Sequence, residues 1–216
     1  MDISQHIVFL IEIIGTIAFA SSGTMVAIEK KLDLFGVIIL GLSTAVGGGM
    51  IRDLILGIHP PMMFQNSIYV KISVIVSVII FLIVYWNNQI LNSKYMKRYT
   101  FVMNLFDAIG LGAFTVIGIH TAYDVGLYDR TLLLTTVGMM TGVGGGMVRD
   151  VLAGQTPTVL KKHIYASASF VGAIVCIIMI RSNIDYSISM IIGALLIIII
   201  RFFATKYRWN LPKAVK

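Results

Sequence analysis

The chain has 216 residues, of which 57% are hydrophobic and only 12% are charged. Soluble domains contain about 25% charged residues, so this composition excludes an ordinary soluble protein and predicts an integral membrane protein. The single cysteine, Cys176, excludes an intrachain disulfide and a thiolate metal cluster. The net charge of +7 can be interpreted only after the basic residues are assigned to the two sides of the membrane.

A membrane-spanning helix needs about 20 mainly apolar residues. Under this rule the sequence predicts a single transmembrane domain over 1–216 with little chain outside the bilayer. In chain order, the seven expected spans cover about 7–28, 34–56, 67–86, 101–120, 131–153, 163–181 and 186–205. The first apolar run is long and follows a polar start, so it is expected to be a retained helix and not a cleaved signal peptide.

A glycine-rich motif occurs twice in the chain. Val46–Asp53 reads VGGGMIRD and Val143–Asp150 reads VGGGMVRD, and the two copies lie 97 positions apart. Upstream of the motif, Glu12 matches Asp107 at an offset of 95 positions. The chain is therefore an internal duplication.

The duplication divides the predicted spans into two copies of three. Repeat 1 covers about 7–86, repeat 2 covers about 101–181, and a seventh helix follows over about 186–205. Because three is an odd number, the second copy must enter the membrane with the opposite orientation. The predicted fold is an all-α membrane protein with an inverted 3+3 repeat and one extra C-terminal helix, an architecture common among transporters.

Loop charge predicts the orientation. With the two motif arginines set aside, one side of the membrane receives twelve basic residues, namely Lys30, Lys31, Lys94, Lys97, Arg98, Lys161, Lys162, Arg201, Lys206, Arg208, Lys213 and Lys216. The other side receives three, Lys71, Arg130 and Arg181. Because cytoplasmic loops are rich in Lys and Arg, we expect an inner (plasma) membrane protein with its N-terminus outside and its C-terminus in the cytoplasm. Topology, with some attraction to membrane lipid, then explains the basic excess without nucleic acid.

A charge inside the bilayer is costly unless it is paired or faces water, so ionisable residues within predicted spans are candidates for a functional site. The gate or ion-pair candidates are Glu12, Arg52, Asp107 and Arg149, together with Asp53 and Asp150. We expect Glu12 beside Arg52 and Asp107 beside Arg149, which would give one polar constriction in each membrane half. The alternative is that these residues form purely structural ion pairs.

Asp53 and Asp150 directly follow the motif arginines. Adjacent helix positions point about 100° apart, so these aspartates are not expected to share a helical face with the arginines. They are expected to cap a neighbouring helix or to hold the loop that follows the motif.

The glycine triplets lower the helix propensity of the spans that contain them, so their presence there indicates a specific structural or functional role. The glycines are Gly47, Gly48, Gly49, Gly144, Gly145 and Gly146. They permit either close helix packing or a kink or break that turns backbone carbonyls toward a passing ion, and their repetition favours the second. Hydroxyl candidates for a hydrated path are Ser43, Thr44 and Thr141 next to the glycines. The first span adds Thr16, Ser21, Ser22 and Thr24, and the second copy adds Thr115, Thr135 and Thr136, although such hydroxyls also bind their own helix carbonyls.

Enzyme and metal chemistry find little support in the sequence. The histidines, His6, His59, His120 and His163, lie near span ends without ligand spacing, so neither a metal site nor a cofactor is expected. The pattern Gly-Gly-x-x-Arg-Asp is similar to a signature of tRNA nucleotidyltransferases, but those enzymes need further carboxylates for magnesium and a solvated cleft. Here apolar helix flanks the motif, so an enzyme is not expected.

Together, the duplicated motif, the Glu12 and Asp107 segments and the extra seventh span resemble the prokaryotic relatives of the TRIC (trimeric intracellular cation) channels, which overlap a bacterial family of glycine-transporter-like proteins. The resemblance covers about 7–205. It implies a homotrimer in which each subunit has its own hourglass pathway for monovalent cations, potassium prominently, flanked by kinked second and fifth helices. The glycines would be the kinks, and Arg52 and Arg149 would be pore or gate residues.

Two qualifications follow from the sequence. The lysine-containing motif through which animal members respond to phosphoinositide lipid is not found in this sequence, so that regulation is not carried over. An arginine cannot lose its charge at ordinary pH, so on a path for potassium or sodium it must be neutralised by a nearby carboxylate or move away.

The leading interpretation is a passive potassium-type channel. A secondary transporter of a small amino acid such as glycine remains the alternative, because inverted repeats also suit alternating access. A non-conducting structural or regulatory membrane protein is the third possibility. A carrier saturates with substrate, whereas a channel gives unitary currents.

Overall fold

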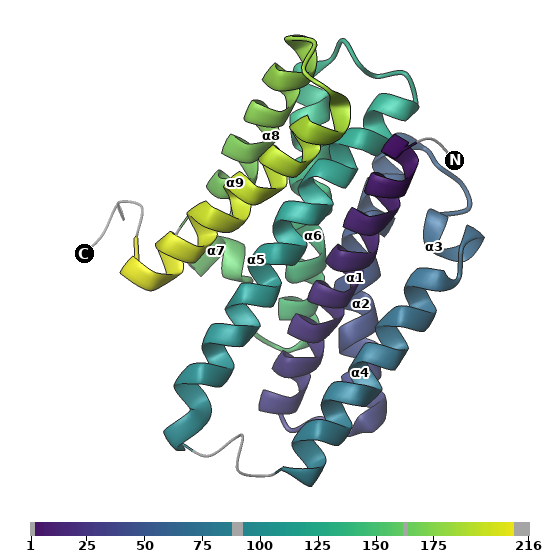
Figure 1. Ribbon diagram of the computed structural model, residues 1–216. Helices are drawn as coiled ribbons and strands as arrows, with labels where there is room; N and C mark the ends of the chain where they lie inside the picture. Colours follow the sequence, from purple (N-terminus) through teal and green to yellow (C-terminus); the bar gives the residue numbers. More distant parts are fainter. Residues whose placement is uncertain (1–2, 88–92, 162–163, 210–216) are drawn as a thin grey trace.

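The computed structural model describes residues 3–87, 93–161 and 164–209, and within these ranges the regular structure is entirely helical (Figure 1). The helices are α1 (Ile3–Glu29), α2 (Leu34–Leu56), α3 (Met62–Gln65), α4 (Ile68–Trp86), α5 (Ser93–Asp124), α6 (Thr131–Leu152), α7 (Thr158–Lys161), α8 (Ala166–Arg181) and α9 (Tyr186–Tyr207). Four residues named in the sequence analysis, Lys162, His163, Lys213 and Lys216, lie outside the described ranges.

Six of these helices, α1, α2, α4, α5, α6 and α9, are long and apolar enough to cross a membrane. The prediction of an all-α membrane protein is therefore confirmed. The sixth expected span corresponds to α8, which is apolar but has only 16 residues. The count of seven spans stays a prediction.

Local signals set the ends of α2 where the sequence placed them. The Asp33 side chain accepts a hydrogen bond from the Gly36 backbone N–H at 2.7 Å, which caps the start of the helix. Gly57 ends the helix in the left-handed conformation at φ 70°, which glycine adopts without steric cost.

The fourth predicted span was too short. It was placed over 101–120, whereas α5 runs from Ser93 to Asp124. Its first turns carry exposed basic residues such as Lys97 and Arg98. Hydropathy locates the apolar part of a helix, but internal hydrogen bonds let the helix continue beyond that part.

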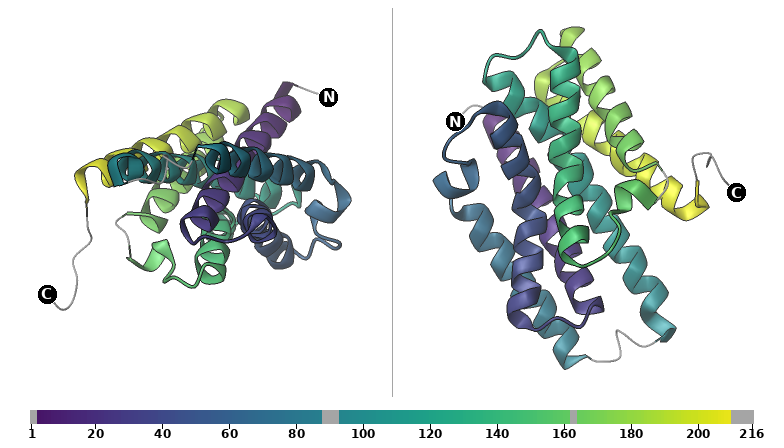
Figure 2. Two further views of the ribbon diagram at one scale, coloured as in Figure 1. Left: turned by 90° about the horizontal axis from the view of Figure 1, so that it is seen from below. Right: turned by 180° about the vertical axis from the view of Figure 1, so that it is seen from behind.

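Four long helices form the centre of the molecule, in which α1 packs on α2 and α5, and α6 packs on α2 and α5. The two halves meet there, and α1 and α5 run in opposite directions (Figure 1). Seen from behind, α2 and α6 lie side by side (Figure 2). Outside this centre, α4 covers α1 and α2, while α8 covers α5 and α6 and α9 packs on α5 and α8.

One assignment from the loop-charge count was wrong. Arg201 was placed in the cytoplasmic tail, but α9 continues to Tyr207 and the Arg201 side chain is buried, with the residue only 2% exposed. The side of α9 that carries Arg201 packs against the protein, so this charge belongs to the interior. The exposed basic residues of α9 are Lys206 and the C-cap Arg208.

Candidate functional site

Two groups of charged residues lie in corresponding places of the two halves. We call Glu12, Arg52, Asp53 and Tyr69 the first cluster, and we call Asp107, Arg149, Asp150, Tyr165 and Arg201 the second cluster. In each cluster the arginine follows a glycine triplet near the end of α2 or α6, and other members of the cluster come from neighbouring helices.

Arg149 of α6 holds the second cluster together. Its Nη1 donates to Asp107 Oδ1 of α5 at 2.6 Å and to Ser22 Oγ of α1 at 2.7 Å. Its Nε donates to Asp150 Oδ1 at 2.8 Å. The structure thus brings Asp107 and Arg149 together, as the sequence led us to expect, and both residues are at most 4% exposed. Removing one partner of such a buried pair costs about 3–5 kcal/mol.

The first cluster is connected differently. Arg52 Nε donates to Asp53 Oδ1 at 2.8 Å, while Glu12 accepts a hydrogen bond from the Tyr69 hydroxyl of α4. The expected contact between Glu12 and Arg52 is therefore replaced by two others: Glu12 binds Tyr69, and Arg52 binds Asp53. Glu12 and Arg52 nevertheless line the same small cavity.

Each motif arginine also contacts the aspartate that follows it, although adjacent helix positions point about 100° apart. An arginine side chain is long enough to fold back over its own helix, so its Nε reaches the adjacent carboxylate. The loop-holding role expected for the aspartates is present as well. Asp53 Oδ2 accepts from the Met62 backbone N–H at 2.7 Å, and Asp150 Oδ2 accepts from the Thr158 backbone N–H at 2.6 Å.

Both glycine triplets lie inside continuous helices, so neither triplet is a break in this conformation. A methyl group added at Gly48 of α2 would overlap the Thr141 carbonyl oxygen of α6, and one added at Gly145 would overlap the Thr44 carbonyl oxygen of α2. These two glycines therefore let the backbones of α2 and α6 touch, as the packing alternative predicts.

The other four glycines have less crowded or different surroundings. Gly47 faces Val148, Gly144 faces Ile51, and Gly146 faces Tyr165, whereas a methyl group at Gly49 would meet only Arg52 Nη2 at 3.9 Å. A substitution would therefore have different effects at neighbouring positions of one triplet.

The hydroxyls nearest the glycines bind their own helices. Thr44 Oγ1 donates to the Leu40 carbonyl and Thr141 Oγ1 donates to the Val137 carbonyl, each at 2.6 Å, and Ser43 donates to the Ile39 carbonyl. The hydroxyl residues that line the two polar cavities include Thr16 and Ser22 of α1.

These cavities lie toward opposite ends of the helical centre. The first has a volume of about 50 Å³ and is lined by Glu12, Thr16, Arg52 and Asp53, among others. The second has a volume of about 240 Å³ and is lined by residues that include Ser22, Glu29, Asp107, Arg149 and Lys161. The first is lined from α1 by Glu12 and Thr16, near the middle of that helix, whereas the second is lined by Glu29 in its last turn and by Thr100 in the first half of α5.

A packed apolar layer lies between the two polar cavities. Thr16, Phe19 and Ser22 follow one another at helical spacing on α1, and the middle residue, Phe19, is 0% exposed. The rings of Phe19 and Phe114 lie 5.3 Å apart between centroids, and Phe19 also packs against Gly145. Together with the α2–α6 glycine contact, this layer separates the two cavities.

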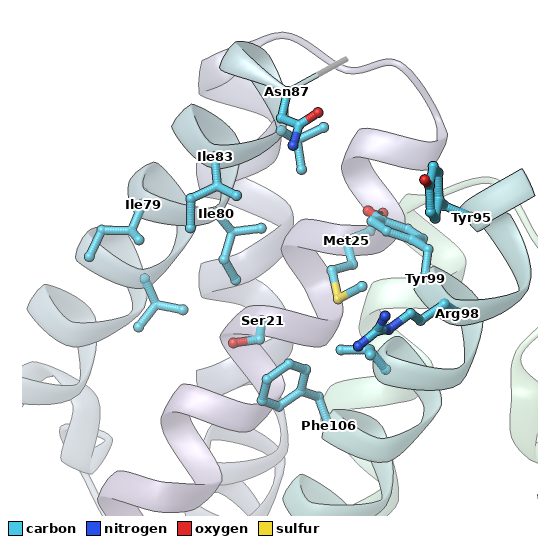
Figure 3. A pocket seen from close by; sticks show the side chains of 13 residues that line it. Ser21, Met25, Ile79, Ile80, Ile83, Asn87, Tyr95, Arg98, Tyr99 and Phe106 are labelled. Carbon is cyan, nitrogen blue, oxygen red and sulfur yellow. Dashed lines mark hydrogen bonds between the residues drawn. The ribbon is translucent and has the colours of Figure 1, made fainter. Parts of the chain in front are cut away.

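A larger cavity, of about 580 Å³, lies between α1, α4 and α5 (Figure 3). Its walls are mainly apolar and include Met25, Ile80 and Phe106, while Asn87 and Arg98 add polar groups. Of the hydroxyl residues singled out in the first span, Ser21 lines this cavity, but none of the residues of the two clusters does.

Sequence reasoning missed three members of the clusters. Arg201 carried a usable signal, since it lies inside the span predicted over 186–205, where a charge is a candidate by default. Tyr69 and Tyr165 carried a weaker one, because they follow Asp53 and Asp150 by 16 and 15 positions respectively. Tyrosine is common at membrane interfaces, so this spacing alone did not identify them.

Known proteins are similar to this chain over most of its length. A family model described as "Glycine transporter" matches residues 9–85 and 104–181, which are the two halves. The UPF0126 membrane protein YvgT of Bacillus subtilis is 34% identical over 203 residues, which is 94% of each chain.

Solved structures of channels are also similar to this chain over most of its length. A prokaryotic TRIC channel crystallised in 0.5 M KCl is 33% identical and has a TM-score of 0.85, with 96% of this chain and 100% of that chain covered. The TRIC trimeric intracellular cation channel orthologue from Rhodobacter sphaeroides is 28% identical and has a TM-score of 0.82, with 93% and 98% covered. The chain therefore belongs to the glycine-transporter-like family of membrane proteins that includes the prokaryotic TRIC channels.

Proposed function

We propose that the protein is a passive channel for monovalent cations with an hourglass pathway inside each subunit. The pathway would run from the first cavity, through the layer of Phe19, Phe114 and the glycine contact, into the second cavity. The observation that carries this proposal is the pair of polar cavities, each with a charge cluster that contains a buried arginine, on either side of one thin apolar layer. The solved cation channels of similar structure support it.

The proposed architecture is the inverted 3+3 repeat with α9 added. It is supported by the opposite directions of α1 and α5 and by the loop contacts of Asp53 and Asp150, which each half repeats (Figure 1). α8 would be the sixth of seven spans. A helix of 16 residues is about 24 Å long, so it would need the residues beside it to cross a hydrocarbon core of about 30 Å.

The orientation of the chain follows from its basic residues. Removing Arg201 from the count leaves eleven residues against three, so the N-terminus is still proposed outside and the C-terminus in the cytoplasm of the inner membrane. The second cavity, which Lys161 lines, would then face the cytoplasm, and the first cavity would face the outside.

The proposed ion is potassium, with sodium as a second permeant ion. Calcium takes six to eight oxygen ligands, whereas the carboxylates of both clusters are already engaged by arginine, tyrosine or backbone groups. A monovalent ion passing with part of its water shell needs fewer protein oxygens. No cofactor is proposed.

The conformation described has a closed pathway, and we propose how it would open. Arg149 would leave Asp107, and α2 and α6 would separate by bending at the glycine triplets, which would then act as the predicted kinks. Gly48 and Gly145 suit this role because they lie at the contact between the two helices. The carbonyl oxygens of Thr44 and Thr141, which face that contact, would become accessible to the ion.

Planar-bilayer recording of the purified protein in asymmetric potassium chloride tests the proposal. Discrete current steps that reverse near the potassium equilibrium potential are expected. Steps that reverse at the chloride potential, or a silent bilayer with verified insertion, would refute it. Chemical crosslinking followed by mass measurement of the purified protein tests the homotrimer that we propose from the relatives.

The second candidate function is a secondary transporter of glycine, which the description of the matching family favours. The same two cavities on either side of a closed layer suit alternating access. Proteoliposomes with labelled glycine distinguish the two functions. Saturable uptake with counterflow, in preparations without unitary currents, would establish the carrier.

A further inference from the structure

We propose that Arg201 of α9 is a positioning residue of the gate, which takes over the Asp107 carboxylate when Arg149 leaves it. This role rests on the proposed channel function. It assigns a task to α9, which belongs to neither copy of the repeat and supplies none of the residues predicted from the sequence.

Arg201 and Arg149 approach different oxygens of Asp107. Arg149 Nη1 donates to Oδ1 at 2.6 Å, whereas Arg201 Nη2 lies 3.8 Å from Oδ2. The second distance exceeds a hydrogen bond by nearly 1 Å, so a small movement of either side chain would form one. The second cluster is thus arranged with one close cation and one cation within reach.

Burial makes the second cation important. Arg201 and Asp107 are 2% and 3% exposed, so water gives little compensation to a carboxylate that loses its partner. Without Arg201, departure of Arg149 would leave the Asp107 carboxylate with no cationic partner among the contacts described, which strongly disfavours opening. With Arg201 in place, Asp107 keeps a cationic partner, and the opening equilibrium shifts toward the open state.

Tyr165 keeps Arg201 where this exchange needs it. The guanidinium carbon of Arg201 lies 4.5 Å from the centroid of the Tyr165 ring, within the range of a cation–π contact. This ring comes from the N-cap of α8 and is only 2% exposed. Arg201 is therefore held beside Asp107 by a contact that does not involve Arg149.

The first cluster lacks this arrangement among its described contacts. Its carboxylate, Glu12, is held by the Tyr69 hydroxyl, and its arginine binds the adjacent Asp53. The exchange between two arginines is thus a property of the second half, where α9 packs on α5. A gate at the second cluster would depend on α9, and a constriction at the first cluster would not.

Single-channel recording of Arg201→Gln tests the role. We expect the open probability to fall about tenfold, because Asp107 would then depend on Arg149 alone, while unitary conductance and reversal potential stay unchanged. Arg201→Lys keeps the charge without the planar guanidinium group, so its open probability should fall about threefold. Lys206→Gln, which removes an exposed charge from the same helix, is the matched control and should behave like the unmodified protein.

A second background separates positioning from general damage. In Asp107→Asn the carboxylate is gone, so adding Arg201→Gln should not change the open probability further. An equal effect of Arg201→Gln in both backgrounds would overturn the role, as would an unchanged open probability in both Arg201 variants. If Arg201→Gln fails to fold, Arg201→Lys decides in the same way. Absence of currents from the unmodified protein would overturn the channel proposal and this role with it, whereas normal currents with unaffected variants would overturn only this role.

Discussion

The contact between α2 and α6 at Gly48 permits a direct test of how the proposed pathway would be held closed. In Gly48→Ala, the added methyl group would overlap the Thr141 carbonyl oxygen and lie within 3.2 Å of the Gly145 backbone nitrogen. These are backbone atoms of the facing helix, so rotation of a side chain cannot relieve the overlap. The two helices must move apart.

The size of the effect can be bounded. Overpacking a well-packed interior costs about 1–3 kcal/mol, and alanine regains up to about 1 kcal/mol of helix propensity over glycine. From the middle of these two ranges, the net cost to the packed conformation is about 1–2 kcal/mol. If separation of α2 from α6 opens the pathway, the open state escapes this cost, and the ratio of open to closed channels should rise about 5–30-fold.

Gly49→Ala is the matched variant for this experiment. It makes the same change one position along α2, but its methyl group would meet only Arg52 Nη2 at 3.9 Å, an ordinary contact. The difference in open probability between the two variants therefore reports the overlap and not helix propensity. Equal open probabilities for Gly48→Ala and Gly49→Ala in single-channel recordings would refute the reasoning, and so would a lower open probability in Gly48→Ala than in Gly49→Ala.

Two further predictions concern the charge clusters. Arg149→Ala should lower the thermal unfolding temperature in detergent more than Arg52→Ala does, because Arg149 neutralises two buried carboxylates, Asp107 and Asp150, whereas Arg52 binds only Asp53. Breaking a buried ion pair costs about 3–5 kcal/mol. Equal unfolding temperatures for the two variants would contradict this ranking. Glu12→Gln should leave the unfolding temperature nearly unchanged, since an amide oxygen can still accept the hydrogen bond from Tyr69. The same variant should reduce the unitary potassium conductance, most at low salt, where the lost charge is least screened. A conductance loss that is the same at high and low salt would argue against an electrostatic role.

Much of the fold could be read from the sequence because hydropathy and duplication are strong signals. The ends of α2 matched the expected span, since Asp33 and Gly57 mark them locally. The contact of Asp107 with Arg149 was also predictable, because two opposite charges inside spans of one bundle have few other ways to be satisfied.

The first cluster could not be predicted in the same way. Glu12 and Arg52 had competing partners that spacing does not rank, namely a tyrosine from α4 and the aspartate beside Arg52. The glycine triplets were ambiguous for a related reason. Small residues permit close packing and bending alike, and only the positions of Thr44 and Thr141 on the facing helices show that packing is used here.

The two halves share a motif but differ in how they hold their carboxylates, and this difference bears on where the pathway would be gated. Glu12, Arg52 and Asp53 together carry one net negative charge, and Glu12 is bound by a neutral hydroxyl. In the second cluster the charges of two aspartates and two arginines cancel, and Arg149 ties three helices together through Ser22, Asp107 and its own α6. A site with net negative charge, whose carboxylate is held by a hydroxyl, suits attraction of a cation, whereas a neutral, cross-linked site suits a barrier that opens by exchanging partners. Arg201 of α9 thus makes two otherwise similar sites electrostatically unequal.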